Sequence, residues 1–587
     1  MSFTQPDSIE WAAMSPVIIV LGAAVVGVLV EAFVPARARR ITQLAIAFAA
    51  TIGAIVAVAA LWSGTRRDGG TMVLGGALVV DGPALVLQGS IAVLTILSLL
   101  VIADRTATGE DAFAPTAASV PGSDYEELAR RKGLEQTEVY PLVLFAAGGM
   151  LIFPATADLL TLFVALEVLS LPLYLLTGMA RRRRLLSQEA SLKYFLLGAF
   201  ASALLVFGIA LVYGYAGTLN YGEIAAVTED PTGLDTLLLV GAVLVLAGLL
   251  FKVGAVPFHT WTPDVYQGAP TPITGFMAAC TKVAAFGALL RIYYTVVPGL
   301  QWDLDVMMWT VAIATMVVGT VVALVQTDVK RLLAYSSIAH AGFILTGIVA
   351  LNPAGVSSVL FYLLVYGVAT VGAFAVIWLV RERTGGSDDD DPRGSVLGEA
   401  THISQWAGLG RTHPALATAF TLFLLSFAGI PLTAGFIGKF TVFSAAVDGG
   451  AWPLALIGVL ASAAAAFFYV RIIVLMFFTA PHGESDEAAA AAAADELSPE
   501  PGPAEPALVG TGVVEAGVVE TGADVATPEG GVATLVAVRP VTTTTTVVPS
   551  EGFAAVAIVL CAAATILLGV FPQPVLDLIA DMATFLR

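Results

Sequence analysis

Four ionisable residues lie inside long apolar stretches of this chain, where a charge is costly. Glu167 is in the middle of DLLTLFVALEVLSLPLYLLTG, and Lys252 is in LVLAGLLFKVGAVPFHTW. Lys282 is in TGFMAACTKVAAFGALLR, and Lys439 is in LLSFAGIPLTAGFIGKFTVFSAA. An ionisable side chain at membrane depth costs several kcal/mol unless it is paired or hydrated, so each of the four is a functional candidate. The alternative is a static charge pair that fixes helix packing, or a side chain that reaches the membrane surface.

One carboxylate and three lysines suit the binding and release of protons. Burial disfavours the charged form of a lysine, and a nearby carboxylate favours it. A change in the distance between Glu167 and Lys252 would therefore switch the lysine between holding and releasing a proton.

Helix breakers accompany two of the lysines. Pro257 follows Lys252 by five residues, and Pro431 precedes Lys439 by eight, with several glycines around it. Proline removes a backbone donor and glycine lets the chain unwind, and freed carbonyls at membrane depth are tolerated only where protein or water satisfies them. We therefore predict two broken helices, each beside a hydrated cavity.

Three further residues are secondary candidates for a proton relay. Lys193 follows Glu189 by four residues, so an ordinary ion pair along a helix is an equally good interpretation. His259 and His340 could relay protons, because histidine is the side chain suited to proton transfer near neutral pH, but each could instead satisfy backbone groups.

Composition defines the broad class of protein. The chain has 587 residues, of which 58% are hydrophobic and 12% charged, and its mean hydropathy is +0.88. A bilayer accommodates that much apolar surface and a soluble core does not. The net charge of -18 comes from hydrophilic stretches such as Asp388 to Asp391, and no basic patch indicates nucleic acid. The N-terminal residues lack the basic region of a cleavable signal peptide, so the first apolar run is predicted to be a retained span.

The cysteines and histidines give no sign of a cofactor. Cys280 and Cys561 lie in apolar runs, whereas an iron–sulfur cluster needs about four thiolates. The five histidines lack the spacing of a zinc site. We expect no cofactor or metal in this chain.

Stretches of membrane-crossing length predict an all-α polytopic membrane protein with about fourteen transmembrane helices. The expected spans are 12–34, 41–62, 83–104, 139–156, 158–178, 189–213, 236–257, 271–296, 305–325, 332–350, 355–380, 414–446, 452–479 and 551–571. The seventh and twelfth are the broken ones. They are five apart and so run in opposite directions, which is typical of two inverted five-helix repeats, residues 139–296 and 305–479.

Basic residues predict the orientation. With fourteen spans, four clusters fall on one face, and by the positive-inside rule this face is cytoplasmic and both termini are outside. Arg66 and Arg67 are the exception, on the other side. The four clusters are Arg37 with Arg39 and Arg40, Arg181 to Arg184, Lys330 with Arg331, and Arg381 with Arg383.

Hydrophilic insertions complete the organisation. After the first three spans (1–104), residues 105–138 are expected to form a charged cytoplasmic loop. Residues 384–413 contain a segment around Ile403, Trp406 and Leu409 that is expected to lie as an amphipathic helix on the membrane surface. Residues 480–550 have a composition typical of a disordered cytoplasmic loop, and 551–587 hold the last helix and a short tail.

Four long motifs resemble one family, the Mrp-antiporter-like subunits of respiratory NADH:quinone oxidoreductase. The motifs are SLKYFLLGAFASALLVFGIALVYGYAGT, FKVGAVPFHTWTPDVYQGAPTPITGFM, DVKRLLAYSSIAHAG and AGIPLTAGFIGKF, and the resemblance runs through spans 4–13. It is greatest with the N-type subunits, because Lys439 stands where M-type subunits usually carry glutamate, and because about 15 residues after the last span leave no room for the lateral helix of L-type subunits.

The resemblance implies a proton-translocating subunit of a bacterial membrane. Glu167, Lys252, Lys282 and Lys439 would carry the proton, with Lys193, His259 and His340 as secondary relay positions. Other subunits would hold the FMN, the iron–sulfur clusters and the quinone site, and the M-type and small K-, J- and A-type membrane subunits would be partners. The alternatives are an Mrp-type cation/proton antiporter, a membrane subunit of a hydrogenase-type or formate-linked complex, and a purely structural membrane anchor.

Overall fold

The computed structural model describes residues 10–107, 109–115, 136–228, 235–384, 396–480 and 543–586, and the isolated positions 123, 125 and 128. The acidic run from Asp388 to Asp391, most of the 105–138 loop and residues 481–542 lie outside the described residues.

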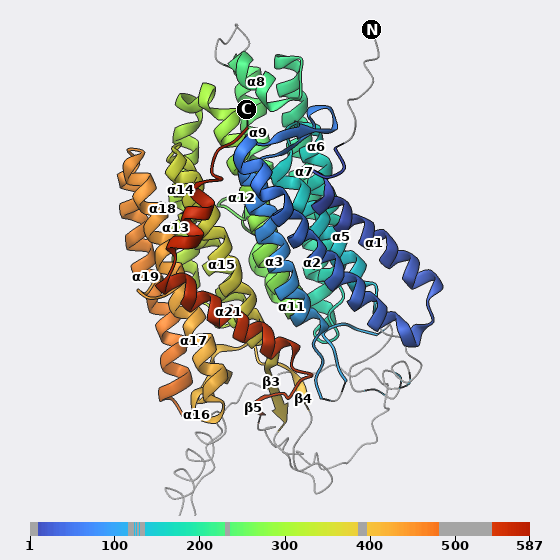
Figure 1. Ribbon diagram of the computed structural model, residues 1–587. Coiled ribbons are helices and arrows are strands. Elements are labelled where there is room, and N and C mark those ends of the chain that lie inside the picture. Colours follow the sequence, from blue (N-terminus) through green and yellow to red (C-terminus); the bar gives the residue numbers. More distant parts are fainter. Residues whose placement is uncertain are drawn as a thin grey trace, which may run out of the picture.

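Long apolar helices dominate the described part of the chain (Figure 1). Twelve helical segments are long and apolar enough to cross a membrane. With the shorter α5 and the α17–α18 pair, they account for the fourteen expected spans, so the all-α membrane fold is confirmed. These helices are α1 (Ser15–Phe33), α2 (Ala36–Asp68), α3 (Gly82–Ala103), α5 (Val139–Ile152), α6 (Leu159–Thr177), α7 (Arg184–Ala216), α9 (Asp235–Val253), α11 (Thr271–Phe276) with α12 (Lys282–Thr295), α13 (Gln301–Leu324), α14 (Val329–Val349), α15 (Pro353–Leu379), α17 (Pro414–Ala428), α18 (Ala434–Asp448), α19 (Trp452–Phe478) and α21 (Phe553–Val570).

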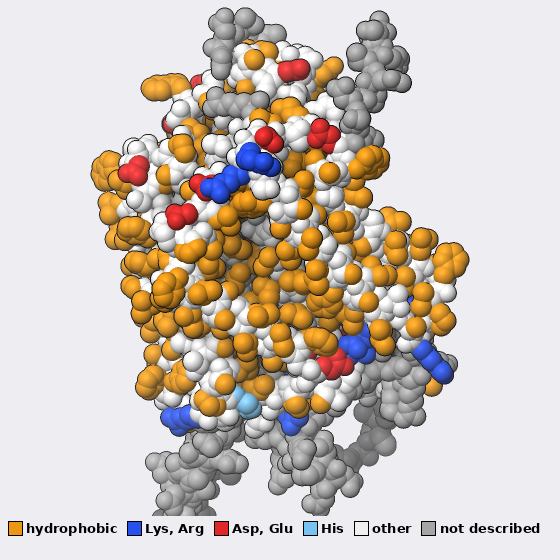
Figure 2. All heavy atoms as spheres, viewed as in Figure 1, with side chains coloured by type: hydrophobic (Ala, Val, Ile, Leu, Met, Phe, Trp, Pro, Cys, Tyr) orange, Lys and Arg blue, Asp and Glu red, His pale blue; other side chains and the backbone are white. Residues whose placement is uncertain are grey.

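The helices form a buried centre and an apolar periphery. The apolar windows of α11–α12, α14 and α15 are 94–100% buried inside the protein, whereas those of α1, α19 and α21 are only 33% buried. A helix that is apolar all round and half exposed needs lipid against its outer face. Figure 2 shows the result, a broad hydrophobic belt with charged side chains near its two ends. Of the candidate residues, Lys282 and His340 lie on these buried central helices.

Short elements cap the two ends. A hairpin of β1 (Thr71–Val73) and β2 (Leu78–Val80), with α8 (Tyr221–Thr228) and α22 (Gln573–Ala580), belongs to the upper end in Figure 1. The lower end carries β3 (Val380–Thr384), β4 (Val396–Glu399) and β5 (Thr543–Val547), an antiparallel sheet in the order β4-β3-β5.

We call the lower end the basic end, because three of the predicted arginine and lysine clusters meet there. Arg182 donates to the carbonyl of Val396, and Arg183 to the hydroxyl of Thr401. Lys330 and Arg381 each lie 3.6 Å from a carboxylate oxygen of Glu399.

The strand β5 corrects the prediction of disorder through residue 550. Residues 543–547 pair with β3 over five positions, and the backbone amide of Val548 donates to the carbonyl of Leu379. Threonine and valine favour strands, but the composition of the stretch gave no sign of a partner strand some 160 residues earlier in the chain.

The predicted surface helix around Trp406 is also wrong. A 3-10 turn (Ile403–Trp406) and the short α16 (Leu409–Thr412) occupy this stretch, and Ile403, Trp406 and Leu409 are at most 3% exposed. The indole of Trp406 donates to the carbonyl of Ala400, and its ring packs on Phe420 of α17 at 4.8 Å. The apolar side chains of this stretch are therefore buried against the ends of the helices, where protein and not lipid covers them.

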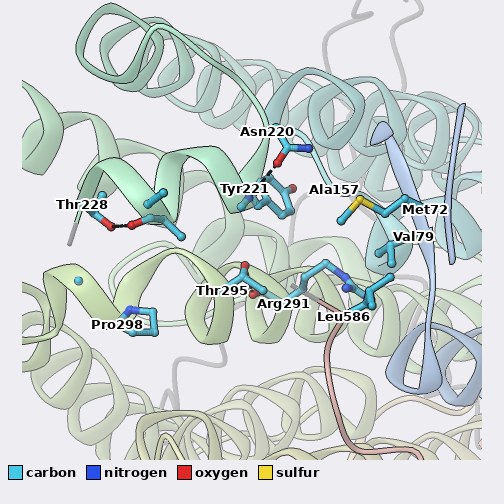
Figure 3. Close-up of a pocket in the computed structure, with 14 residues that line it drawn as sticks. Met72, Val79, Ala157, Asn220, Tyr221, Thr228, Arg291, Thr295, Pro298 and Leu586 are labelled. Carbon is cyan, nitrogen blue, oxygen red and sulfur yellow. Dashed lines mark hydrogen bonds between the residues drawn. The ribbon is translucent and has the colours of Figure 1, made fainter. Parts of the chain in front are cut away.

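A buried ion pair joins three distant segments at the upper end. The guanidinium of Arg291 donates to both carboxylate oxygens of Asp81, at 2.7 and 2.8 Å, and neither side chain is more than 2% exposed. Asp81 also caps α3 through the amide of Ala84 and accepts from the amide of Leu586 at 3.1 Å. Residues 581–586, which we call the tail, are thereby fixed against α3 and α12. A cavity of about 230 Å³ lies beside them, lined by Arg291, Leu586 and Tyr221 (Figure 3).

Candidate functional site

The first broken helix lies where Pro257 predicts it. Helix α9 ends at Val253, and Gly254 adopts φ +80°, a left-handed conformation that favours glycine. The amides of Gly254 and Ala255 both donate to the carbonyl of Leu250, and the chain resumes as α10 (Trp261–Gly268). Protein satisfies the freed backbone groups, because the indole of Trp261 donates to the carbonyl of Phe251 at 2.8 Å.

The second broken helix has the same kind of end. Helix α17 ends at Ala428, Gly429 adopts φ +80°, and the amides of Gly429 and Ile430 both donate to the carbonyl of Leu425. Pro431 follows, and α18 begins at Ala434. The matching caps give the two breaks a common local geometry, an αL glycine followed by a second donor to one carbonyl.

Lys439 fills the second break with its ammonium group. The Nζ atom donates to the carbonyls of Phe427 and Ala428 at 2.7 and 3.1 Å, and to the hydroxyl of Ser462 at 2.6 Å. Its side chain is 5% exposed. These partners are neutral oxygens, so the ammonium is solvated by the break itself and is not held by a carboxylate.

Lys252 stands just before the first break, and its hydrogen-bond partners are likewise neutral. Its Nζ donates to the hydroxyls of Ser170 on α6 and Tyr194 on α7, at 2.9 and 3.0 Å. The ammonium also lies 5.1 Å from the centre of the Tyr194 ring, a distance at which a cation is attracted to the aromatic face. The Tyr194 ring in turn stacks on Trp261 at 4.7 Å, so the break positions the residue that holds the lysine.

Glu167 lies on α6, and its carboxylate bonds a hydroxyl group and not Lys252 of α9. Its carboxylate accepts from the hydroxyl of Ser202 on α7 at 2.5 Å. Glu167 and Ser170 are three residues apart and share one face of α6. The half-buried carboxylate of Glu167 is therefore about one helical turn from the Ser170 hydroxyl that binds Lys252, and the two charged groups are separately bonded. The interpretation as a static charge pair does not describe this arrangement.

Lys282 follows a distortion in the eighth span. A π-turn (Met277–Thr281) separates α11 from α12, and such turns often occur at functional sites. The Nζ of Lys282 donates to the carbonyl of Ser337 on α14 and lies 5.9 Å from the ring centre of Tyr366. The side chain is 3% exposed. Here too, a buried ammonium has neutral partners.

His340 on α14 lies between Lys282 and Lys439. Its ring packs on Tyr366 at 4.9 Å, the ring that Lys282 approaches. It packs also on Phe343 at 5.5 Å, and the Nζ of Lys439 lies 4.9 Å from the Phe343 ring centre. The sequence indicates His340 only as a secondary position, whereas the structure places it centrally.

Two tyrosines that the sequence analysis missed bond the imidazole of His340. Its Nδ1 lies 2.7 Å from the hydroxyl of Tyr362 on α15, and its Nε2 lies 3.3 Å from that of Tyr469 on α19. In the sequence both are aromatic residues in apolar runs, which are usually packing residues.

Lys193 and His259 lie away from this central group. Lys193 forms the predicted ion pair with Glu189 at 2.6 Å and a second one with Asp264 of α10 at 2.8 Å. Asp264 also pairs with Arg331 at 2.7 Å. His259 lies half-buried in the first break, and its Nδ1 has no hydrogen-bond partner within the part of the chain that the structure describes. Among the same residues no cluster of three or more His, Cys, Asp or Glu side chains is placed to hold a metal.

The fold and the site define an antiporter-like membrane protein, with two broken helices, a buried lysine beside each break, and a third lysine near a buried histidine. Residues 156–464 match the family described as NADH:quinone oxidoreductase/Mrp antiporter, TM. The chain is 60% identical over the full length of both chains to NADH-quinone oxidoreductase subunit N of Beutenbergia cavernae. It is 58% identical to a subunit N of Streptomyces griseus, with 79% of this chain and 84% of the relative covered. The chain belongs to the NADH-quinone oxidoreductase subunit N family.

Solved structures agree with the fold. A chain of respiratory complex I from Thermus thermophilus is 28% identical with a TM-score of 0.68, and 97% of this chain and 100% of that chain are covered. A chain of the Mrp complex from Dietzia sp. is 23% identical with a TM-score of 0.72, covering 98% and 97%. The second likeness shows a common fold alone. The resemblance noted in the sequence is confirmed, and the full-length relatives favour the oxidoreductase over the antiporter.

Proposed function

We propose that this chain is the proton-translocating membrane subunit of a bacterial NADH:quinone oxidoreductase. The single observation that carries the proposal is a buried group of three residues, Lys282, His340 and Lys439, which we call the buried triad. Proton transfer needs groups whose charge can change at membrane depth, and these residues are bonded to neutral partners that tolerate either charge state. The redox centres belong to other subunits of the complex, and other membrane subunits are its partners.

Glu167 and Lys252 set the direction in this proposal. A shift of the carboxylate toward the lysine favours the ammonium, and its withdrawal releases the proton. The separate hydrogen bonds of Glu167 to Ser202 and of Lys252 to Ser170 support two alternative arrangements, because neither group depends on the other for its partner. A proton enters near the first break, passes Lys252 and Lys282, and leaves by way of Lys439. Lys193 and His259 are secondary positions on the entry side.

The orientation and the repeats are part of the same proposal. Basic residues prefer the cytoplasmic side, so the basic end is cytoplasmic and the tail lies outside. The units 139–296 and 305–479 are the two inverted repeats, and the matching glycine caps at the breaks support this. In this orientation the proton enters from the cytoplasm through the first repeat and leaves through the second.

Substitution of Lys252 tests the proposal in the purified whole complex reconstituted in vesicles. We expect Lys252→Ala to lower NADH-driven proton translocation at least about tenfold, because a group that transfers protons contributes that much or more. Arg471→Ala, which removes an exposed cation outside the buried triad, is the control and should translocate protons normally. Normal translocation by the Lys252 variant, in a complex that still contains the flavin and iron–sulfur subunits, would refute the role. Co-purification with small membrane proteins alone, and sodium-driven proton exchange, would instead identify an antiporter.

A further inference from the structure

The imidazole of His340 has a tyrosine hydroxyl at each nitrogen. Tyr362 comes from α15 and Tyr469 from α19, so two helices on different sides hold the ring of a third. A neutral imidazole has one N–H donor and one bare nitrogen, so one tyrosine accepts from the ring while the other donates to it. The arrangement works with either tautomer, provided that both hydroxyls turn together.

One further hydrogen bond extends this arrangement beyond Tyr469, and residues adjacent in sequence bring its two ends near two buried lysines. The hydroxyl of Tyr469 bonds that of Ser336, which is next in sequence to Ser337, whose carbonyl accepts from Lys282. At the other end, the ring of Tyr362 rests on Gly438, the residue before Lys439, where a Cβ atom would meet it at 2.4 Å. The hydrogen-bonded row Ser336–Tyr469–His340–Tyr362 therefore has Ser336 next to the partner of Lys282 at one end. At its other end, Tyr362 contacts the residue before Lys439.

The remaining neighbours of the imidazole are aromatic faces. Phe343, Tyr366 and Phe427 surround it with ring centres at 4.9–5.6 Å, and His340 itself is 2% exposed. Between the described groups, the two tyrosine hydroxyls are the hydrogen-bond partners of the ring. A proton that crosses His340 along existing hydrogen bonds must therefore use them.

We propose that Tyr362 and Tyr469 are relay residues that carry the proton across His340. This inference rests on the proposed function and names two further residues for it. Tyr469 gives its proton to the bare nitrogen of His340 and takes one from Ser336, which is reprotonated by the ammonium of Lys282. The opposite nitrogen of His340 gives its proton to Tyr362, which gives its own to the neutral amine of Lys439. Each O–H or N–H bond that breaks is matched by one that forms, so Lys282 ends neutral, Lys439 ends as an ammonium, and the groups between them end neutral. The hydroxyls and the tautomer then turn back before the next proton arrives.

Removal of single hydroxyl groups tests the relay with little change of shape. Tyr362→Phe, Tyr469→Phe and the double variant are made in the whole complex, and proton translocation per NADH is compared with uncoupled electron transfer. We expect each single variant to lower translocation at least about tenfold. Because the groups act in series, the double variant should be no worse than either single one. The control is Tyr294→Phe, which removes hydroxyl contacts to the carbonyls of Gly347 and Asn352 away from the row and should stay within about twofold of the parent.

The outcomes separate a relay from a support for the ring. Translocation within about twofold of the parent in both single variants would overturn the inference. Small losses that add up in the double variant would also overturn it, because a relay in series is already broken by either single substitution. Lys282→Ala distinguishes this failure from failure of the proposed function. If that variant loses translocation while the tyrosine variants keep it, only the relay is wrong; if it also translocates normally, the proposed function fails.

Discussion

Replacement of Asp81 should release the tail, and the structure gives the size of the effect. Asp81→Ala leaves the guanidinium of Arg291 without its carboxylate at a site that is 2% exposed. Breaking a buried pair from one side costs about 3–5 kcal/mol. The variant also removes the cap on α3 that Asp81 forms with the amide of Ala84, which costs about 1 kcal/mol. The total is about 4–6 kcal/mol of stability at the upper end.

Hydrogen exchange measured on the whole complex is the assay for this prediction. The amide of Leu586 bonds the Asp81 carboxylate, so its exchange should accelerate at least about a hundredfold in Asp81→Ala, and the complex should melt at a lower temperature. The matched control is Arg66→Ala. Arg66 pairs with Asp581 in the same region, but the side chains are 57% and 46% exposed, and such pairs are worth about 0–1 kcal/mol.

A double variant makes the reasoning refutable. Asp81→Asn with Arg291→Met removes both charges and keeps a side chain that can cap α3, so it should be more stable than Asp81→Ala. If Asp81→Ala exchanges and melts like the parent, or if the double variant is the least stable of the three, the pair does not hold the tail.

Three further predictions concern the second break and the basic end. Gly435→Ala should impair assembly, because its Cβ would lie 1.9 Å from the carbonyl oxygen of Ser426. Gly64→Ala, near the C-terminal end of α2 where a Cβ meets nothing within 4 Å, should be neutral or stabilising by about 1 kcal/mol; subunit content of the purified complex checks both. Trp406→Ala should cost about 3–5 kcal/mol in thermal or chemical unfolding, and a mild effect would contradict the burial of its indole. Burial alone would raise the pKa of Glu399, but Lys330 and Arg381 hold it below its ordinary value of 4.5. Its contribution is therefore complete above pH 4.5 and lost as the pH falls through the lowered pKa, so the melting difference between the parent and Glu399→Gln should be large at pH 7 and shrink in acid; a constant difference would contradict this.

The sequence reveals groups whose chemistry conflicts with their surroundings. Lys252 and Lys439 are visible as charges in apolar runs, and Pro257 and Pro431 as breakers beside them, because each violates a local rule of membrane helices. The gathering of basic residues at one end of the described structure is also visible in the sequence, because these residues directly flank the apolar spans.

Pairings between distant segments were not visible in the sequence. Tyr362 and Tyr469 obey the local rules of apolar helices, and only the packing of α14, α15 and α19 brings their hydroxyls to His340. The strand β5 needed a partner strand whose position depends on the whole bundle. Arg291 does break a local rule, because it is a charge in an apolar span like Lys282, and this pattern by itself indicates a buried partner of opposite charge.

The hydrogen bond between Leu586 and Asp81 also constrains the order of biogenesis. The two residues are 505 positions apart in the chain. At about 5–20 residues per second, a ribosome needs about 25–100 s to travel between them. During that time Asp81 has already left the ribosome, whereas first Arg291 and then Leu586 are still to be made. The upper end can therefore close only after synthesis of the last span, α21, which packs against α3 and α15. Membrane insertion of this chain proceeds with an open upper end, which residues 581–586 close.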